Sequence, residues 1–206
     1  MGRQSLGPFG HLAVGPVLRK YSPDRKGEVI FYGASNFRLW LEMEEDLAPY
    51  REQNHGIGGA TDVTMMRFAG ELVFQYQPAA LFFQTGSNDY ALGMTVEQVK
   101  ENKKKMYQEY RDRLPGVPLV VMSGLPLPGR PEFWPQIDEV NRFLEGYCAL
   151  YPDMYFADAT GILMTADGKF RPELFKPDQI HLNHEGQLVW AGLIKEMLRK
   201  IDAPVK

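Results

Sequence analysis

One serine, one histidine and one aspartate are spaced in the sequence so that they could form a nucleophile and its base. Ser35 follows an apolar run and a glycine in "VIFYGAS", and Asp178 precedes His181 by three residues in "DQIHLN". A serine hydroxyl attacks a carbonyl group only when an imidazole takes its proton, and that imidazole needs a carboxylate to orient it. The three residue types therefore predict nucleophilic catalysis at Ser35.

Two further motifs could stabilise the oxyanion that such an attack creates. The segment "NHGIGG" ends at Gly59, and "TGSND" contains Asn88. The backbone N–H groups of Ser35 and Gly59 and the side-chain amide of Asn88 could supply three hydrogen-bond donors. If the strands before these motifs are neighbours in a parallel sheet, their carboxyl ends meet at one edge. We predict the functional site at that edge.

Each candidate also has a purely structural interpretation. Ser35 could cap the helix that follows it, Asn88 could form a turn, and Asp178 could be an ordinary loop residue. Gly59 and the neighbouring glycines could form a tight turn between a strand and a helix. Taken singly these interpretations are the stronger ones, but the four motifs in their order along the chain favour catalysis.

The intervening segments predict the elements that position these residues. Apolar runs typical of strands buried on both faces occur at "EVIFYG", "AALFFQT", "VPLVVMSG" and "DMYFAD", and a weaker strand is expected near 50–54. Helices are expected over 61–77, 96–114, 135–150 and 186–201. The alternation predicts an α/β fold, a three-layer α/β/α sandwich whose five-stranded parallel sheet has right-handed crossovers. The order 2-1-3-4-5 would place strands two and three on either side of strand one. The segment "SGLPLPGRPEFWP", after the fourth strand, could line a pocket.

Length and composition fit one domain over residues 1–206. The chain is 44% hydrophobic and 24% charged, which is ordinary for a single packed core. Residues 1–27 are rich in glycine and proline and are expected to form an irregular N-terminal arm. The lysine run at 103–105 is assigned to a solvated helix face. A formal net charge of -3 gives no electrostatic reason to expect nucleic acid or an anionic membrane as a partner.

The remaining signals concern the cellular compartment and metal binding. Cys148 is the single cysteine, which excludes an internal disulfide and fits a reducing compartment. The sequence has neither a secretory signal nor an apolar stretch long enough to span a bilayer, so a cytoplasmic location is expected. His55 is interpreted as a turn residue bonded to the backbone and His184 as a surface residue. The histidine, cysteine and carboxylate spacings do not predict a metal site.

The four motifs, in order, resemble blocks I, II, III and V of the SGNH hydrolases, also called GDSL-type lipases and esterases. This resemblance implies a flavodoxin-like fold and hydrolysis of carboxylic esters through an acyl-serine, with no metal and no other cofactor. Matched by position, the block residues of the family fall on Ser35, Gly59, Asn88, Asp178 and His181.

The resemblance has one departure and leaves the substrate open. Ala34 stands where the family usually has an aspartate next to the nucleophile. That aspartate is not the triad carboxylate, so its loss removes hydrogen bonds around the turn and keeps the triad. The expected substrates are short-chain acyl esters, such as acetyl esters of carbohydrates or small molecules. The alternatives are a lysophospholipase or thioesterase, and a catalytically silent flavodoxin-like binding module. The oligomeric state stays open, and a homo-oligomer is compatible with the sequence.

Overall fold

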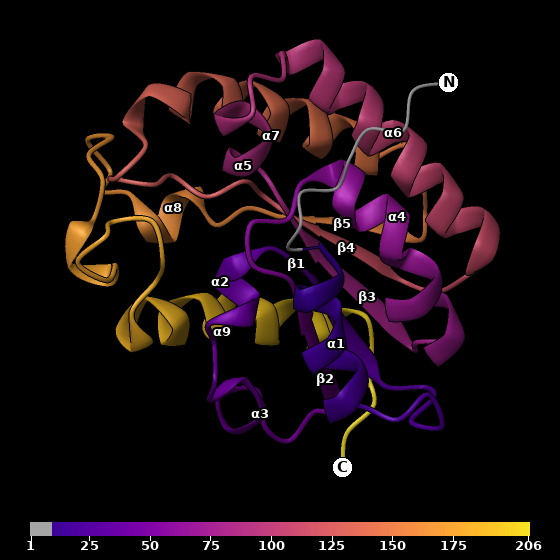
Figure 1. Ribbon diagram of the computed structural model, residues 1–206. Coiled ribbons are helices and arrows are strands. Elements are labelled where there is room, and N and C mark those ends of the chain that lie inside the picture. The colour runs from indigo at the N-terminus through magenta and orange to yellow at the C-terminus, as the bar shows by residue number, and fades with distance from the viewer. Residues whose placement is uncertain (1–9) are drawn as a thin grey trace.

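The computed structural model describes residues 10–206, and parallel strands form the centre of this part of the chain (Figure 1). Their order in the five-stranded sheet is β2-β1-β3-β4-β5, which confirms the predicted topology. The strands are β1 (Val29–Gly33), β2 (Glu52–Gly56), β3 (Ala80–Gln84), β4 (Leu119–Met122) and β5 (Met154–Ala157).

Helices cover both faces of the sheet, so the fold has three layers. One face packs against α1 (Gly10–Lys20), α4 (Asp62–Leu72), α6 (Val96–Arg113) and α7 (Trp134–Cys148). The other packs against α2 (Ser35–Arg38), α3 (Met43–Asp46), α8 (Thr160–Leu163) and α9 (His184–Lys200). The short helix α5 (Ser87–Ala91) follows β3, and 3-10 turns occupy Phe74–Tyr76, Pro131–Phe133 and Pro172–Leu174.

Strand β1 shows why the apolar runs predicted buried strands. Ile30 and Tyr32 belong to the apolar cluster on one face of the sheet, and Val29 and Phe31 belong to the cluster on the other face. Successive side chains in a strand point to opposite faces. A strand covered on both sides therefore needs apolar residues at every position, and all of β1 and β3 is buried.

The structure corrects two expectations about the first third of the chain. Residues 10–20 form helix α1, so this part of the expected irregular arm is regular, while residues 1–9 of the arm lie outside the described residues. The second strand spans Glu52–Gly56 rather than 50–54. It lies at the edge of the sheet, and its buried Gln53 and His55 side chains find hydrogen-bond partners. The side-chain amide of Gln53, for instance, donates to a carboxylate oxygen of Glu28 at 3.0 Å.

The expected helices differ from the observed ones mainly at their ends. Helix α4 begins after Thr61, whose Oγ1 accepts a hydrogen bond from the N–H of Thr64, and a separate 3-10 turn follows the helix over Phe74–Tyr76. Helix α6 begins with a capping box of Thr95 and Gln98. Such reciprocal bonds satisfy N–H groups that have no partner within the helix.

The lysine run on α6 is not uniformly solvated, which corrects a further expectation. Lys103 is buried, and its ammonium group lies 3.0 Å from a carboxylate oxygen of Asp62 on α4. The next two lysines are exposed. A helix turns by about 100° per residue, so neighbouring residues face different surroundings.

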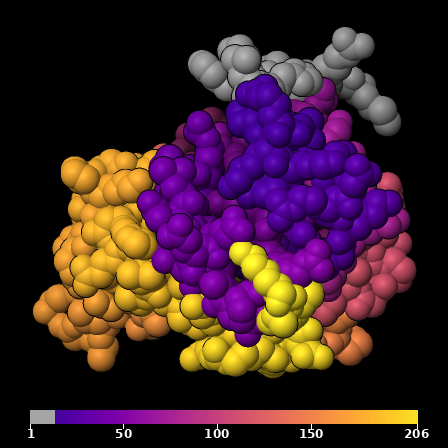
Figure 2. Space-filling view, turned by 90° about the horizontal axis from the view of Figure 1, so that it is seen from below, coloured from indigo at the N-terminus to yellow at the C-terminus, as the bar shows by residue number. Residues whose placement is uncertain are grey.

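The C-terminal residues pack against the segment that leads into the edge strand β2. Figure 2 shows the yellow C-terminal segment against purple residues from earlier in the chain. The N–H of Arg51 donates to the carbonyl of Pro204 at 3.0 Å, and Tyr50 forms an isolated bridge with Val205. Within residues 10–206, every helix is too short or too polar to cross a lipid bilayer.

Candidate active site

Ser35 is the first residue of α2, directly after the turn that ends β1. The N-cap residue is Ala34, and the serine side chain makes no capping hydrogen bond. Instead, Ser35 Oγ lies 2.9 Å from Nε2 of His181. The capping interpretation of Ser35 is therefore wrong, and the hydroxyl group faces an imidazole nitrogen.

Asp178 completes a hydrogen-bonded series with this histidine. Its Oδ2 lies 2.7 Å from Nδ1 of His181, and its Oδ1 accepts from the backbone N–H groups of Ile180 and His181 at 2.9 and 3.0 Å. Partial burial acts to raise the pKa of Asp178, but hydrogen bonds from the His181 ring and these two N–H groups lower the pKa to about 2. The carboxylate is ionised and can hold the imidazole in the tautomer that leaves Nε2 free to accept a proton.

Asn36 attaches the loop of His181 to the serine turn. Its side-chain amide donates to the carbonyl of Ile180 at 3.3 Å, and its Oδ1 accepts from the N–H of Leu182 at 2.9 Å. These two partners are the residues on either side of His181. Because Asn36 follows Ser35 directly, one amide fixes the distance between nucleophile and base.

Ala34, where the family usually has an aspartate, leaves the nucleophile turn held by the main chain. The N–H of Ala34 donates to the carbonyl of Gln84 at 3.1 Å, and its carbonyl accepts from the N–H of Arg38 at 3.2 Å. The methyl group of Ala34 belongs to the apolar cluster that also contains Ile57. Replacement of the family's aspartate by Ala34 thus places a methyl group among apolar residues, and the backbone hydrogen bonds of the turn are still formed.

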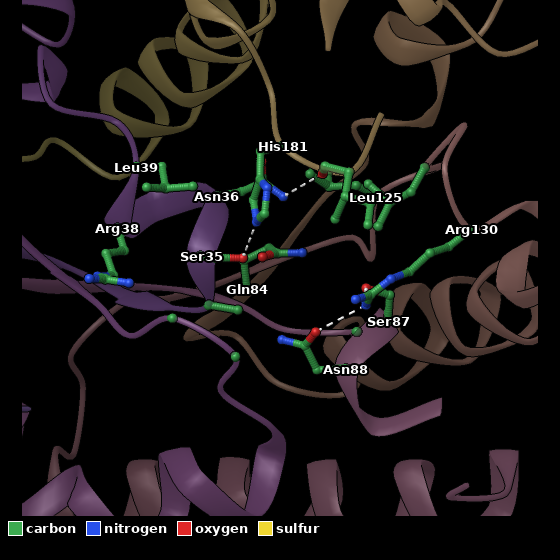
Figure 3. Close-up of a pocket in the computed structure, with 16 residues that line it drawn as sticks. Ser35, Asn36, Arg38, Leu39, Gln84, Ser87, Asn88, Leu125, Arg130 and His181 are labelled. Atoms are coloured by element: carbon green, nitrogen blue, oxygen red, sulfur yellow. Dashed lines mark hydrogen bonds between the residues drawn. The ribbon is translucent and has the colours of Figure 1, made fainter. Parts of the chain in front are cut away.

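The three expected oxyanion donors lie at the carboxyl ends of three neighbouring strands. Ser35 is the first residue of α2, where a backbone N–H has no acceptor within its helix. Gly59 has φ +70°, and this left-handed turn suits glycine because a side chain would be strained there. Asn88 follows β3 and faces the same cavity (Figure 3).

The amide of Asn88 is held in one orientation by two partners of fixed polarity. Its Nδ2 donates to the carbonyl of Ala60 at 3.0 Å, and its Oδ1 accepts from Nη1 of Arg130 at 3.1 Å. A carbonyl can only accept and a guanidinium can only donate, so the amide cannot be reversed. One hydrogen bond uses one amide hydrogen, and the second hydrogen is available for an oxyanion.

A cavity of about 330 Å³ contains these groups (Figure 3). Besides Ser35, Gly59, Asn88 and His181, it is lined by Ala34, Asn36, Arg38, Leu39, Gly58, Gln84, Gly86, Ser87, Leu125, Leu127, Arg130 and Ile180. Asp178 does not line the cavity and reaches it only through His181.

Three residues of the site were missed from the sequence: Asn36, Arg38 and Arg130. Arg130 lies within the segment that was expected to line a pocket, and Leu125 and Leu127 from that segment do line it. The two large aromatic residues of the segment, Phe133 and Trp134, pack against the apolar core instead. For Asn36 and Arg38, the only sequence feature that could have indicated a place in the site was their position in the first helical turn after Ser35.

The other histidines and the cysteine lie away from the cavity. His55 is fully buried in β2, where its ring contacts the carbonyl of Leu72 at 2.6 Å, and burial lowers its pKa to about 4. His184 pairs with Asp46 on the surface at 3.1 Å. Cys148 is buried, which raises its pKa to about 12. Among the described residues, no group of three or more His, Cys, Asp or Glu could hold a metal ion.

A serine, a histidine and an aspartate joined in series at the carboxyl edge of a parallel sheet have the arrangement of a serine hydrolase. The sequence model of the GDSL-like Lipase/Acylhydrolase family matches residues 30–189. The chain belongs to this family of carboxylic ester hydrolases, which are also called SGNH hydrolases. The matched range includes all five residues expected at the site.

Solved structures share the fold at low sequence identity. A GDSL-like lipase from Bacteroides thetaiotaomicron VPI-5482 has a TM-score of 0.73 and 20% identity over 93% of this chain and 97% of that one. A carbohydrate esterase family 3 structure from Talaromyces cellulolyticus has a TM-score of 0.65 and 19% identity over 85% and 98%. An acetyl esterase mutant with acetate ion has a TM-score of 0.65 and 18% identity over 85% and 98%. No curated protein matches the chain.

Proposed function

We propose that this protein is a serine esterase that hydrolyses short-chain acyl esters, acetyl esters in particular, through an acyl-serine at Ser35. The observation that carries the proposal is the continuous series of contacts from Ser35 Oγ through His181 to Asp178, with distances of 2.9 and 2.7 Å. The hydroxyl group of this series opens into the cavity that also contains the expected oxyanion donors.

In the first half of the reaction, Ser35 Oγ attacks the ester carbonyl carbon while Nε2 of His181 takes the hydroxyl proton. The charge on the former carbonyl oxygen is stabilised by the N–H groups of Ser35 and Gly59 and the amide of Asn88. The bond to the alcohol oxygen then breaks, and His181 returns the proton to the leaving alcohol. The acyl group remains on Ser35.

In the second half, water takes the place of the alcohol. His181 removes a proton from the water as it attacks the acyl carbon, and the same donors stabilise the second oxyanion. The bond to Ser35 Oγ breaks, the serine regains its proton from His181, and the carboxylic acid leaves. Asp178 stays ionised throughout and stabilises the imidazolium.

The cavity favours a short acyl group. A volume of about 330 Å³ lies at the lower end of the range for small-molecule sites. Its large apolar side chains are few, namely Leu39, Leu125, Leu127 and Ile180, and polar or small residues form the rest of the lining. An acetyl esterase and a carbohydrate esterase family 3 structure among the similar folds are consistent with this choice.

We expect a fluorophosphonate probe to label Ser35 and Ser35→Ala to abolish both labelling and ester turnover. The physical reason is that only this hydroxyl is paired with an imidazole in the cavity. The experiment combines mass spectrometry of the labelled protein with rates on 4-nitrophenyl esters from acetyl to palmitoyl. Rates should be highest for the shortest chains.

Thr160→Ala is a matched control, because it removes a hydroxyl group outside the cavity lining. An adduct on a residue other than Ser35 would contradict the assigned nucleophile. Highest rates on the long-chain esters would favour the lysophospholipase or thioesterase alternative. Inactivity on every ester together with an unlabelled Ser35 would favour the silent binding module.

A further inference from the structure

The cavity at Ser35 contains two guanidinium groups and no carboxylate. Arg38 and Arg130 line it, and no aspartate or glutamate from the described part of the chain does. The chain as a whole has a formal net charge of -3. Concentrated positive charge in the cavity of an acidic protein indicates that the cavity attracts a negatively charged group.

The positive charge of Arg130 has no counter-charge among its side-chain hydrogen-bond partners, because both are neutral. Its Nη1 donates to Ser87 Oγ at 2.9 Å and to Asn88 Oδ1 at 3.1 Å. Within residues 10–206 it forms no ion pair, whereas Arg111 pairs with Asp153 at 3.1 Å. The two hydrogen bonds therefore hold the guanidinium of Arg130 at the cavity wall without neutralising it.

Arg38 supplies a second charge on the other side of Ser35 (Figure 3). Its side chain is exposed, and no described residue forms a hydrogen bond or ion pair with its guanidinium. The guanidinium lies over Gly58, where a Cβ atom would be only 2.6 Å from Nη1 of Arg38. The guanidinium therefore lies close to the backbone of Gly58, beside the Gly59 turn.

We propose that Arg38, together with Arg130, makes the cavity selective for esters whose alcohol part carries an anionic oxyacid group, a carboxylate or a phosphate. This inference rests on the proposed function, because it requires that Ser35 attacks a short acyl ester. The acyl group must lie against Ser35 and the oxyanion donors, so the larger alcohol part extends into the remaining cavity. A guanidinium there can bind an oxyacid group through paired N–H donors.

The test compares anionic and neutral acetyl esters of similar shape. The carboxylate arm uses 4-acetoxybenzoate against methyl 4-acetoxybenzoate, and the phosphate arm uses 4-acetoxyphenyl phosphate against 4-acetoxyanisole. The readout is the ratio of kcat/KM for the anionic ester to that for its neutral partner. In Arg38→Gln this ratio should fall by on the order of 10-fold, which corresponds to one charge-assisted hydrogen bond. Arg38→Lys should keep part of the preference for the anionic ester.

Two controls separate local binding from net charge. Arg142→Gln removes the same charge from an exposed position on α7 outside the cavity lining, and the ratio should keep its wild-type value. In the wild type, added salt should lower the ratio, because ions screen exposed charges. A fall in only one arm supports the inference and identifies the oxyacid group.

The failure of this inference differs from the failure of the proposed function. Equal losses of kcat/KM on anionic and neutral esters in Arg38→Gln, or an unchanged ratio, would overturn charge recognition while esterase activity stands. Wild-type protein that hydrolyses none of the four esters and is not labelled at Ser35 would instead overturn the esterase proposal.

Discussion

The amide of Asn88 has one hydrogen bonded to a turn and a second that the proposed mechanism assigns to the oxyanion. One amide hydrogen joins the loop after β3 to the carbonyl of Ala60, which lies in the loop after β2. The other faces the cavity, and Arg130 bonded to Oδ1 sets this orientation. In the proposed mechanism a single side chain therefore couples the geometry of the turn to the stabilisation of an oxyanion, and its substitution should affect both.

Asn88→Ala should lower kcat by on the order of 100- to 1,000-fold with little change in KM, because an oxyanion donor acts mainly in the transition state. It should also cost about 1 kcal/mol of stability for each lost hydrogen bond, Ala60 and Arg130 being the partners. Steady-state kinetics and urea denaturation measure the two effects. Asn88→Asp keeps the acceptor for Arg130 but lacks the donor, so its kcat should fall at least as far. A destabilised Asn88→Ala enzyme with normal kcat would refute the oxyanion role.

At the scale of elements, a buried ionic network joins α4, α6 and the segment after β3, beneath the site. The ammonium group of Lys103 lies 3.0 Å from Asp62 Oδ1 and 2.8 Å from Thr85 Oγ1. The backbone N–H of Asp62 donates to Asp89 at 3.1 Å. Asp62 begins the helix after the Gly59 turn, and Asp89 follows Asn88 in α5. Burial and the nearby Asp62 raise the pKa of Asp89.

Lys103→Met should destabilise the fold by about 3 to 5 kcal/mol, because it leaves the buried carboxylate of Asp62 without its cation. Urea denaturation gives the free energy of unfolding. Lys105→Met is the matched control: this lysine is on the same helix but exposed, and its loss should change stability by less than about 0.5 kcal/mol. Equal losses of unfolding free energy in the two variants would show that the buried pair of Lys103 and Asp62 does not stabilise the fold.

At the scale of the whole molecule, stability depends on pH through buried groups far from the cavity. Burial, with a smaller contribution from Glu44, raises the pKa of Glu52 from 4.5 to about 7. Between these values the folded chain holds a proton that the unfolded chain has lost. The contribution of Glu52 to stability is therefore complete below pH 4.5 and is lost as the pH rises towards 7. His55, with its pKa lowered to about 4, acts in the opposite direction.

Glu52→Gln should remove this loss, because the amide resembles the protonated acid and does not titrate. Moving from pH 4.5 to pH 8, the variant should gain on the order of 3 kcal/mol of stability relative to the wild type. Urea denaturation of both proteins at the two pH values measures the difference. Both proteins contain His55, so its effect cancels. Parallel changes in the two proteins would contradict the raised pKa of Glu52.

The sequence alone predicted the topology, which the structure confirms, and the five residues proposed for the site, because their signals are local. An apolar run such as 79–83 must be buried on both faces, and the small polar residues after it must end the strand. With the strand order 2-1-3-4-5, the segments that follow the first three strands and carry Ser35, Gly59 and Asn88 share one edge. The motif of Asp178 and His181 lies within a single loop, where three residues of separation suffice for contact.

Only the tertiary structure decided the features that depend on neighbours distant in sequence. The polar strand β2 includes the buried Gln53, whose amide bonds to Glu28, a partner that no local pattern records. Lys103 is buried while Lys105 is solvated, since the choice depends on the position of Asp62 on another helix. Arg38 and Arg130 meet at one cavity only after the sheet has brought the ends of β1 and β4 together. Burial, charge pairing and cavity shape are properties of the packed chain, and short stretches of sequence do not specify them.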